Sequence, residues 1–293
     1  MTLFWQVLIN GILSGGLYAC AAIGFSVIWG VMNLINLAHG SMIILGAYIT
    51  YMTTSTIGID PFLTLPVSGC ALFILGFLIQ KYLINHVIGG SIFMTLILTF
   101  GLDLLLINAY LLIFSADLCA ITPWYAGLGW EWGNVKIPYT RVGAFVFAIG
   151  LTLLLSLFMN RTKLGNAIRA TSFDKDAASL AGVDVFKVYA ITFGIGAGMA
   201  GMAGTLMSVM YSFSPVTGEI FTMKAFVIVV LGGLGSMPGA IVGGIILGLA
   251  ENFASVLLSP GYKDAVSFFL LVIILVLRPR GILGKRFYAE VRD

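Results

Sequence analysis

The chain has 293 residues, of which 60% are hydrophobic and only 9% are charged, and its formal net charge is +3. The mean hydropathy is +1.07, whereas roughly a quarter of the residues in ordinary soluble domains are charged. So much apolar surface excludes a water-soluble globular fold. The composition therefore predicts an integral membrane protein, surrounded by membrane lipid and with no nucleic acid among its partners.

Continuous apolar runs recur along the whole chain, and most are near the ~20 residues that a helix needs to cross the hydrocarbon core. The start, Met1 to Trp5, has no basic region, so we expect the first run to remain as a span rather than to be cleaved as a signal. The predicted fold is all-α: one polytopic transmembrane helical bundle over residues 1–293, with about nine spans. These spans are expected near 6–29, 37–54, 62–83, 91–114, 142–160, 188–211, 220–233, 238–258 and 263–278.

The segment 220–233 is short for a full span. It leads into the turn GGLGSMPG at 232–239, where glycines permit positive φ and Pro238 cannot continue a helix. Short helices interrupted by glycine are typical of discontinuous transporter helices. A re-entrant loop is an equal alternative, and it would change the number of crossings.

Basic residues gather in two places: ten of the fifteen lysines and arginines lie within 161–187 and 278–292. Basic residues beside spans mark the cytoplasmic side, so the 161–187 loop and the C-terminus are both predicted to face the cytoplasm. Five spans before the loop then place the N-terminus outside. The outward connection 115–141 is rich in tryptophan and tyrosine, which suits either the headgroup level or contact with an external partner.

Glycine, with 36 residues, is the second organising feature. Spacings of four residues let two helix backbones approach closely, so these glycines predict tight helix packing and not chemistry. The pairs are Gly11 and Gly15, Gly194 and Gly198, Gly239 and Gly243, and Gly244 and Gly248.

The 161–187 loop is the largest polar segment on the predicted inner face, and we expect it to fold as short helices. Asp174 can cap a helix start, Asp176 suits the positive end of the helix dipole, and Gly182 can adopt the left-handed conformation that ends a helix. Ala177 and Ala178 leave a slim helix that suits a groove on a partner. From these residues alone, a solvated connector is favoured over a docking segment.

Four stretches in chain order carry a family resemblance: GVMNLINLAHG at 30–40, the 165–184 loop, Lys224-Ala-Phe followed by GGLGS at 232–236, and RPRG at 278–281. They resemble the permeases of branched-chain amino acid ABC importers, of the LivH and LivM type. In that family the loop docks on the ATPase subunit. The resemblance therefore implies ATPase coupling by Gly165, Arg169, Asp174, Ala177, Ala178, Gly182 and Asp184.

The same resemblance implies a multi-pass protein of the bacterial inner membrane that works with other subunits. These are two ATPase subunits, a second related permease (a heteromer being favoured) and an external solute-binding protein. The chain contains no Gly-x-x-x-x-Gly-Lys-[Ser/Thr] phosphate loop, so ATP is expected to be used by the partner subunits. No cofactor is expected to bind this chain.

Polar residues inside apolar spans are costly and mark candidates for a translocation pathway. Asp103 is expected either to line the pathway or to pair with a basic group. Glu251 lies in a glycine-rich span, where a buried hydrogen-bonded tie is the alternative. Lys224 and Glu219 flank the short segment and are expected chiefly to position it.

The break between the first two predicted spans supplies the other candidates. Asn33, Asn36 and His39 lie between Gly30 and Gly40, where non-helical backbone is tolerated only beside protein or water. They are predicted pathway elements, although a rigid hinge whose amides cap helix ends is an equal alternative.

Other functions are considered on the same residues. An intramembrane enzyme needs a nucleophile with a base, or a metal constellation, yet the chain has two histidines and no His-Glu-x-x-His or Gly-x-Ser-x-Gly motif. We therefore expect no catalytic residue and no metal site. Two alternatives remain open: an importer of the same class that carries urea or short amides, and a passive solute channel.

Overall fold

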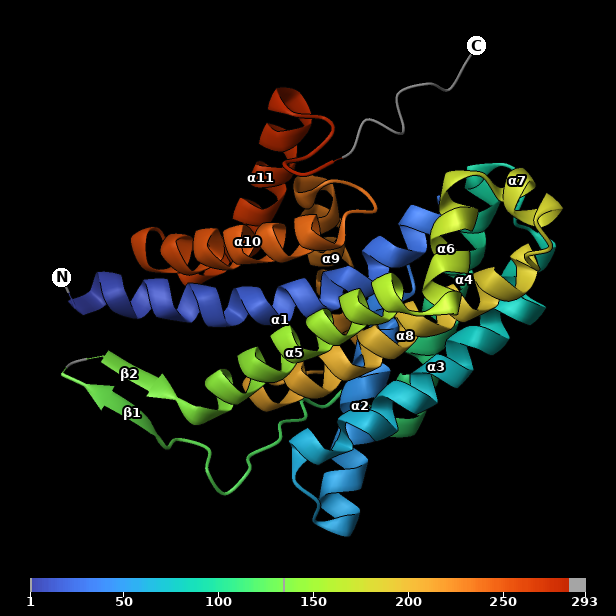
Figure 1. The fold of residues 1–293 in the computed structure, drawn as a ribbon. Coiled ribbons are helices and arrows are strands. Elements are labelled where there is room, and N and C mark those ends of the chain that lie inside the picture. The colour runs from blue at the N-terminus through green and yellow to red at the C-terminus, as the bar shows by residue number, and fades with distance from the viewer. Residues whose placement is uncertain (1, 134, 285–293) are drawn as a thin grey trace.

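The computed structural model describes residues 2–133 and 135–284, and most of them are helical (Figure 1). The basic tail continues past Gly284, so its last residues lie outside the described ranges. In chain order the elements are α1 (Thr2–Met32), α2 (His39–Ile57), η1 (Pro61–Thr64), α3 (Leu65–Tyr82), η2 (Ile84–His86), α4 (Ile92–Phe114), β1 (Gly129–Trp132), β2 (Val135–Pro138), α5 (Tyr139–Arg161), α6 (Lys163–Phe173), α7 (Lys175–Leu180), α8 (Val185–Met210), η3 (Pro215–Thr217), α9 (Gly218–Gly232), α10 (Met237–Leu257), η4 (Pro260–Tyr262) and α11 (Lys263–Leu277).

Eight helical segments are long and apolar enough to cross a membrane, which confirms a polytopic helical membrane protein. Helix α2, within the predicted span near 37–54, is not among them, so a ninth crossing stays a prediction. The segment at 220–233 does qualify, because η3 extends it back to Pro215. The eight segments are α1 from Leu3, η1 to η2, α4, α5, α8, η3 with α9, α10, and η4 with α11.

One element was not predicted, a two-stranded antiparallel hairpin in the 115–141 connection. Trp130 pairs with Ile137 across the hairpin. Gln6 fastens the hairpin to the start of α1, since its side-chain amide donates to the Lys136 carbonyl at 2.9 Å and accepts from the Lys136 N–H at 2.8 Å. The short strands escaped prediction because the apolar and aromatic residues of this segment also suit a membrane-surface loop.

The glycine pairs lie where helices cross, as predicted. A Cβ built on Gly15 would lie 2.7 Å from the Ile245 Cα, and one built on Gly244 would lie 2.6 Å from the Ala19 backbone nitrogen. Helices α1 and α10 therefore pack along each other backbone to backbone. The same holds for α3 and α8, where a Cβ on Gly198 would lie 3.1 Å from the Gly69 carbonyl oxygen.

The order of a long helix, a break, a shorter helix and two further helices occurs twice, in α1–α4 and in α8–α11. Helices α1 and α8 run in opposite directions (Figure 1), while α1 packs on α10 and α8 packs on α3. The two short helices begin beside each other, because a Cβ on Gly218 would lie 2.9 Å from the Gly40 carbonyl carbon. This is the arrangement of an inverted repeat, and transporters of that kind bind substrate where the repeats meet.

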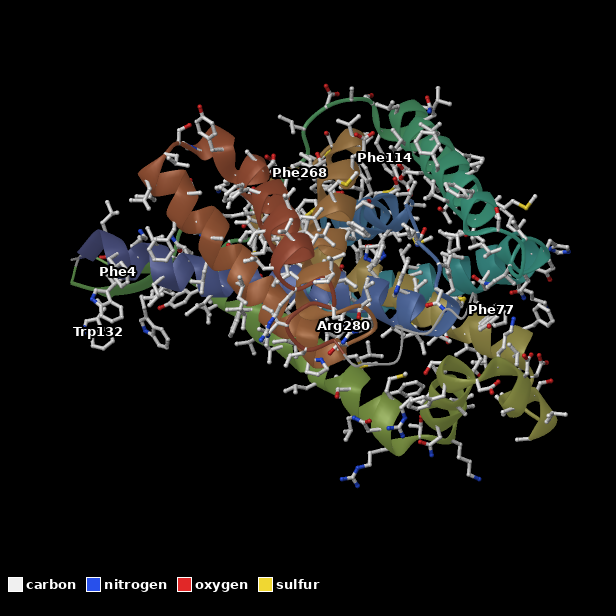
Figure 2. All side chains as sticks on the ribbon, turned by 90° about the horizontal axis from the view of Figure 1, so that it is seen from above. Phe4, Phe77, Phe114, Trp132, Phe268 and Arg280 are labelled. Carbon is white, nitrogen blue, oxygen red and sulfur yellow. The ribbon has the colours of Figure 1, made fainter. Side chains whose placement is uncertain are left out.

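The bundle has two distinct ends. The start of α1 and the hairpin form one, which we call the hairpin end, and helices α6 and α7 form the other, the basic-loop end (Figure 1). Phe4 and Trp132 mark the hairpin end in Figure 2, with Phe77 far from them along the bundle. The last described residues return to the end of α9, where the Leu283 N–H donates to the Gly232 carbonyl at 2.9 Å.

Candidate functional sites

A buried ion pair joins α9 to α10. The Lys224 Nζ lies 3.0 Å from a Glu251 carboxylate oxygen, and only 9% of Lys224 and 1% of Glu251 are exposed. The Tyr18 hydroxyl donates to Glu251 at 2.7 Å, and the Ser267 hydroxyl donates to it at 2.6 Å. Helices α1, α9 and α11 therefore all contribute to solvating one carboxylate, which is the buried tie expected as an alternative for Glu251. Such pairing is what a charge needs in a medium without water.

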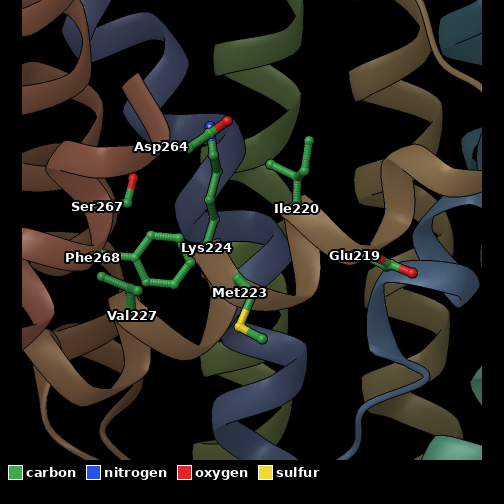
Figure 3. A pocket seen from close by; sticks show the side chains of 8 residues that line it. All are labelled: Glu219, Ile220, Met223, Lys224, Val227, Asp264, Ser267 and Phe268. Carbon is green, nitrogen blue, oxygen red and sulfur yellow. The ribbon is translucent and has the colours of Figure 1, made fainter. Parts of the chain in front are cut away.

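Lys224 also has a second, more open partner. The carboxylate of Asp264, in the first turn of α11, lies 3.3 Å from the Lys224 Nζ, and the Asp264 side chain is 53% exposed. This outer pair borders a cavity of about 280 Å³ between α9 and α11 (Figure 3). The residues that line the cavity are Glu219, Ile220, Met223, Lys224, Val227, Asp264, Ser267 and Phe268.

The local sequence explains how these side chains meet. Helix α10 carries glycines on the face toward α1, so the two backbones approach closely and Tyr18 reaches Glu251. The turn Ser259-Pro260 then starts a new helix, because the Ser259 hydroxyl accepts from the Gly261 N–H. This reversal brings Asp264 and Ser267 of α11 back over Lys224.

Two further residues predicted for the pathway, Asn36 and His39, lie in the core at the start of α2. The His39 Nε2 lies 2.8 Å from the Ala21 carbonyl oxygen, and the His39 ring packs edge-on against Phe25. The Asn36 amide reaches the sulfur of Met42 at 3.9 Å. Both side chains are fully buried, so in this conformation they hold the junction between α1 and α2, and their role in a pathway remains a prediction.

Asn33 lies apart from this pair. It ends α1 in the left-handed conformation with φ 50°, and its N–H donates to the Trp29 carbonyl at 2.8 Å. The left-handed end is a recognised use of asparagine at a helix terminus. Its exposed side chain borders a larger cavity of about 740 Å³ near the basic-loop end, together with residues 88–92 and 171–176.

Asp103 accepts a short hydrogen bond from the Ser41 hydroxyl, and the Tyr110 hydroxyl donates to the Ser41 carbonyl at 3.2 Å. These contacts join α4 to the first turn of α2. Among the described residues Asp103 forms no ion pair, so its observed partner is a neutral hydroxyl rather than the basic group considered from the sequence.

The basic loop folds as short helices, as expected. Asp174 begins α7, since its carboxylate accepts from the N–H groups of Asp176 and Ala177 at 2.9 and 3.0 Å. Gly182 closes it with φ 84°. Asp184 begins α8 by accepting from the Lys187 N–H at 3.1 Å. Two aspartates and one glycine of the loop thus end or begin helices; the sequence predicted this role for Asp174 and Gly182, but not for Asp184.

The proposed docking residues of this loop face in different directions. Gly165 and Ala178 are buried, so they position α6 and α7 against the bundle. Arg169 donates to the side-chain oxygens of Asn160 and Asn166 at 3.0 and 2.6 Å. Ala177 is exposed beside Leu180, whose side chain is 91% exposed. The sequence analysis did not single out Leu180. An apolar residue on an otherwise polar helix could have indicated a contact surface.

Removal of the α7 cap should loosen the basic loop without disturbing the bundle. In Asp174→Ala the N–H groups of Asp176 and Ala177 lose their acceptor, and such a loss costs about 1 kcal/mol of helix stability. We expect amide hydrogen exchange over 175–181 to become about fivefold faster, and exchange in α1 and α10 to be unchanged. Asp174→Asn retains an oxygen acceptor and should exchange like the native protein; equal exchange in both variants contradicts the cap.

The sequence analysis also did not predict several residues that surround the ion pair. Tyr18 and Ser267 are uncharged side chains in apolar runs, and their sequence offers no sign that they face Glu251. Asp264 had a signal, as an acidic residue at the start of a predicted span. Its partner, however, is 40 positions away in the chain, which no local pattern could indicate.

A bundle of candidate spans with a charge cluster between helices, and a capped polar loop at one end, defines a polytopic membrane protein of the transporter class. Residues 7–275 match the family described as branched-chain amino acid transport system / permease component. The chain therefore belongs to this family. It is a permease component of an ABC transport system, which confirms the resemblance, and for such a component neither catalysis nor a cofactor is expected.

Comparison with individual proteins gives the same family. The chain is 36% identical to the high-affinity branched-chain amino acid transport system permease protein LivH of Escherichia coli (strain K12), with 96% of each chain covered. It is 34% identical to the corresponding protein BraD of Pseudomonas aeruginosa, again over 96% of each. Identity to LivM of Escherichia coli (strain K12) is 28%, over 91% of this chain and 68% of LivM. No solved structure matches the chain.

Proposed function

We propose that the chain is the LivH-like permease subunit of a high-affinity, ATP-driven importer of branched-chain or other neutral hydrophobic amino acids. The observation that carries this proposal is the 36% identity to a permease of that name over 96% of both chains. The match extends through the spans and the basic loop alike. The cargo follows from the relatives' names, while the residues described above would supply the pathway and the coupling.

The partners follow from the same relatives. Similarity to both LivH and LivM supports a second, related permease subunit in the complex, and therefore a heteromer. Two ATPase subunits and an external solute-binding protein complete the proposed importer. The ATPases would use the ATP, and their closure would drive alternating access through α6 and α7.

The proposed location is the bacterial inner membrane, with the basic-loop end in the cytoplasm. Arg161, Lys163, Arg169 and Lys175 cluster there, and basic residues favour the cytoplasmic side. Residues 282 and 283, beyond α11, bond to the end of α9, and we propose that the C-terminus is cytoplasmic as well. The hairpin end would then face the solute-binding protein.

The pathway is proposed to run beside the meeting point of α2 and α9. His39 lies at this point, and Asp103 bonds to Ser41 beside it. Lys224 lies further along α9 and pairs with Glu251 of α10. Asn36 precedes α2, and Asn33 ends α1. Polar groups placed where two inverted repeats meet support a translocation role. Urea or short amides remain the alternative cargo, and a passive channel remains the alternative of another class.

Uptake of labelled leucine, alanine and urea into proteoliposomes that hold the complete complex tests the proposal. We expect leucine uptake that requires both ATP and the solute-binding protein. Preference for urea would change the cargo and keep the importer class. Flux that needs neither ATP nor a binding protein would replace the importer with the channel.

Coupling through α7 has its own test in Leu180→Asp. A carboxylate placed in an apolar contact without a partner costs about 1–3 kcal/mol, so ATPase binding should weaken about tenfold or more. ATP-driven uptake should fall with it, while the variant remains monodisperse. Leu128→Asp, at a 50% exposed site near the hairpin, is the matched control and should retain ATPase binding. Normal ATPase binding by Leu180→Asp would exclude this contact.

A further inference from the structure

The two carboxylates around Lys224 are held very differently. Glu251 is almost completely buried and accepts hydrogen bonds from Tyr18 and Ser267, so it is a fixed counterion. Asp264 is about half exposed, and its carboxylate forms a 3.3 Å ion pair with Lys224. When the outer pair separates, the exposed Asp264 carboxylate can turn to water, and Lys224 keeps Glu251 as its counterion. The outer pair can therefore open at small cost while the inner pair persists.

An open Lys224–Asp264 pair presents one ammonium and one carboxylate, side by side, to the cavity. Figure 3 shows the two head groups adjacent at one end of the cavity, while Glu219 points away from them. The zwitterion of an α-amino acid carries the complementary charges on neighbouring atoms. Its carboxylate can accept from Lys224 and its ammonium can donate to Asp264, so each charge exchanges one partner for another and none is left unpaired.

The rest of the cavity is apolar. Phe268 and Val227 lie beside the Lys224 stem in Figure 3, and Met223 lies near them. Pockets that bind small molecules are mostly apolar with a few placed polar groups. A wall of this composition favours an aliphatic side chain over a polar one, and methionine adapts to side chains of different shape.

We propose that the cavity between α9 and α11 is a binding site for the zwitterion of an aliphatic α-amino acid, which inserts between Lys224 and Asp264. This inference rests on the proposed function and identifies where the cargo contacts the permease itself. Glu251, 3.0 Å from the Lys224 Nζ, holds that side chain in place when Asp264 turns to the ligand. Phe268, Met223 and Val227 contact the aliphatic side chain.

Direct binding to the purified complex, without the solute-binding protein, tests the site. The probes are labelled leucine, 4-methylpentanoate, which lacks the ammonium, and glycine, which lacks the side chain. We expect leucine to bind more tightly than either. In Asp264→Asn, leucine affinity should fall about tenfold, the usual worth of a hydrogen bond to a charged group. The affinity for 4-methylpentanoate should not fall, because this probe has no ammonium and its carboxylate is repelled by Asp264.

Two further variants complete the experiment. Phe268→Ala should weaken leucine and leave glycine unchanged, which gives a second readout if Asp264→Asn is poorly folded. Asp117→Asn changes an exposed carboxylate outside the cavity and should bind leucine like the native protein. Unchanged leucine binding in both Asp264→Asn and Phe268→Ala overturns the site.

ATP-driven leucine uptake by the native complex separates the two proposals. If that uptake is present while the Asp264 and Phe268 variants bind leucine normally, the zwitterion site is wrong and the importer stands. If the native complex transports no amino acid with ATP, the importer proposal itself fails.

Discussion

Replacement of Gly248 with leucine is expected to prevent the bundle from assembling. A Cβ at this position would lie 2.5 Å from the Gly11 carbonyl oxygen and 2.6 Å from the Gly15 Cα. These neighbours are backbone atoms, so α1 and α10 would have to separate. Overpacking of a tight contact costs about 3 kcal/mol at the upper end of the usual range, and a branched side chain between two backbones should reach that value or exceed it.

Separation of α1 from α10 also removes the Tyr18 hydroxyl from Glu251, which adds to the loss. We therefore expect Gly248→Leu to give no monodisperse protein in detergent, or a thermal midpoint far below that of the native chain. Gly101→Leu in α4 and Gly150→Leu in α5 are matched controls, because no described atom from another helix lies within 4 Å of a Cβ at either position. A native midpoint in Gly248→Leu would contradict the packing of α1 on α10.

The second large effect is expected for Lys224→Met. It leaves the Glu251 carboxylate buried with two hydroxyl donors and no cation, and removal of one partner from a buried ion pair costs about 3–5 kcal/mol. The outer partner Asp264 is exposed and can turn to water, so most of the loss should come from Glu251. The measurement is the thermal midpoint of the purified protein in detergent.

A double-mutant cycle identifies the cause. Glu251→Gln in the Lys224→Met background removes the unpaired charge, and the amide can still bond to both hydroxyls. We expect the double variant to recover about 2 kcal/mol relative to Lys224→Met alone. If the two losses simply add, the pair does not act as a unit. Lys136→Met is the control, because its 3.4 Å pair with Glu131 is largely exposed and contributes about 0–1 kcal/mol.

The loop residues show where sequence reasoning succeeds. Asp174 and Gly182 act on backbone groups within four residues of themselves, so the capping roles predicted for them follow from local spacing. The prediction of close helix packing from the glycine pairs was confirmed for a related reason. A missing side chain at helical spacing indicates a close backbone approach whatever the partner helix is.

The candidate pathway shows where such reasoning ends. The six residues predicted for it do not form one cluster. Lys224 and Glu251 pair, Asn36 and His39 are buried at the start of α2 with Asp103 bonded to Ser41 beside them, and Asn33 borders a separate cavity. Each was recognised because a polar group in an apolar span needs a partner. Which partner it has depends on helices that are far apart in the chain.

The sequence by itself determined that the chain lies in a membrane, that it is helical, where most of its spans are and to which family it belongs. Hydropathy, helix length and the order of motifs can all be read along the chain without knowledge of tertiary contacts. Only the tertiary structure decided that Tyr18, Lys224, Glu251 and Ser267 share one site and that Asp264 lies at its rim. Those contacts join residues up to 233 positions apart. They exist because glycine-lined helices approach closely enough to exclude lipid. A charge buried between such helices is stable only when it is paired with an opposite charge or with hydrogen-bond donors.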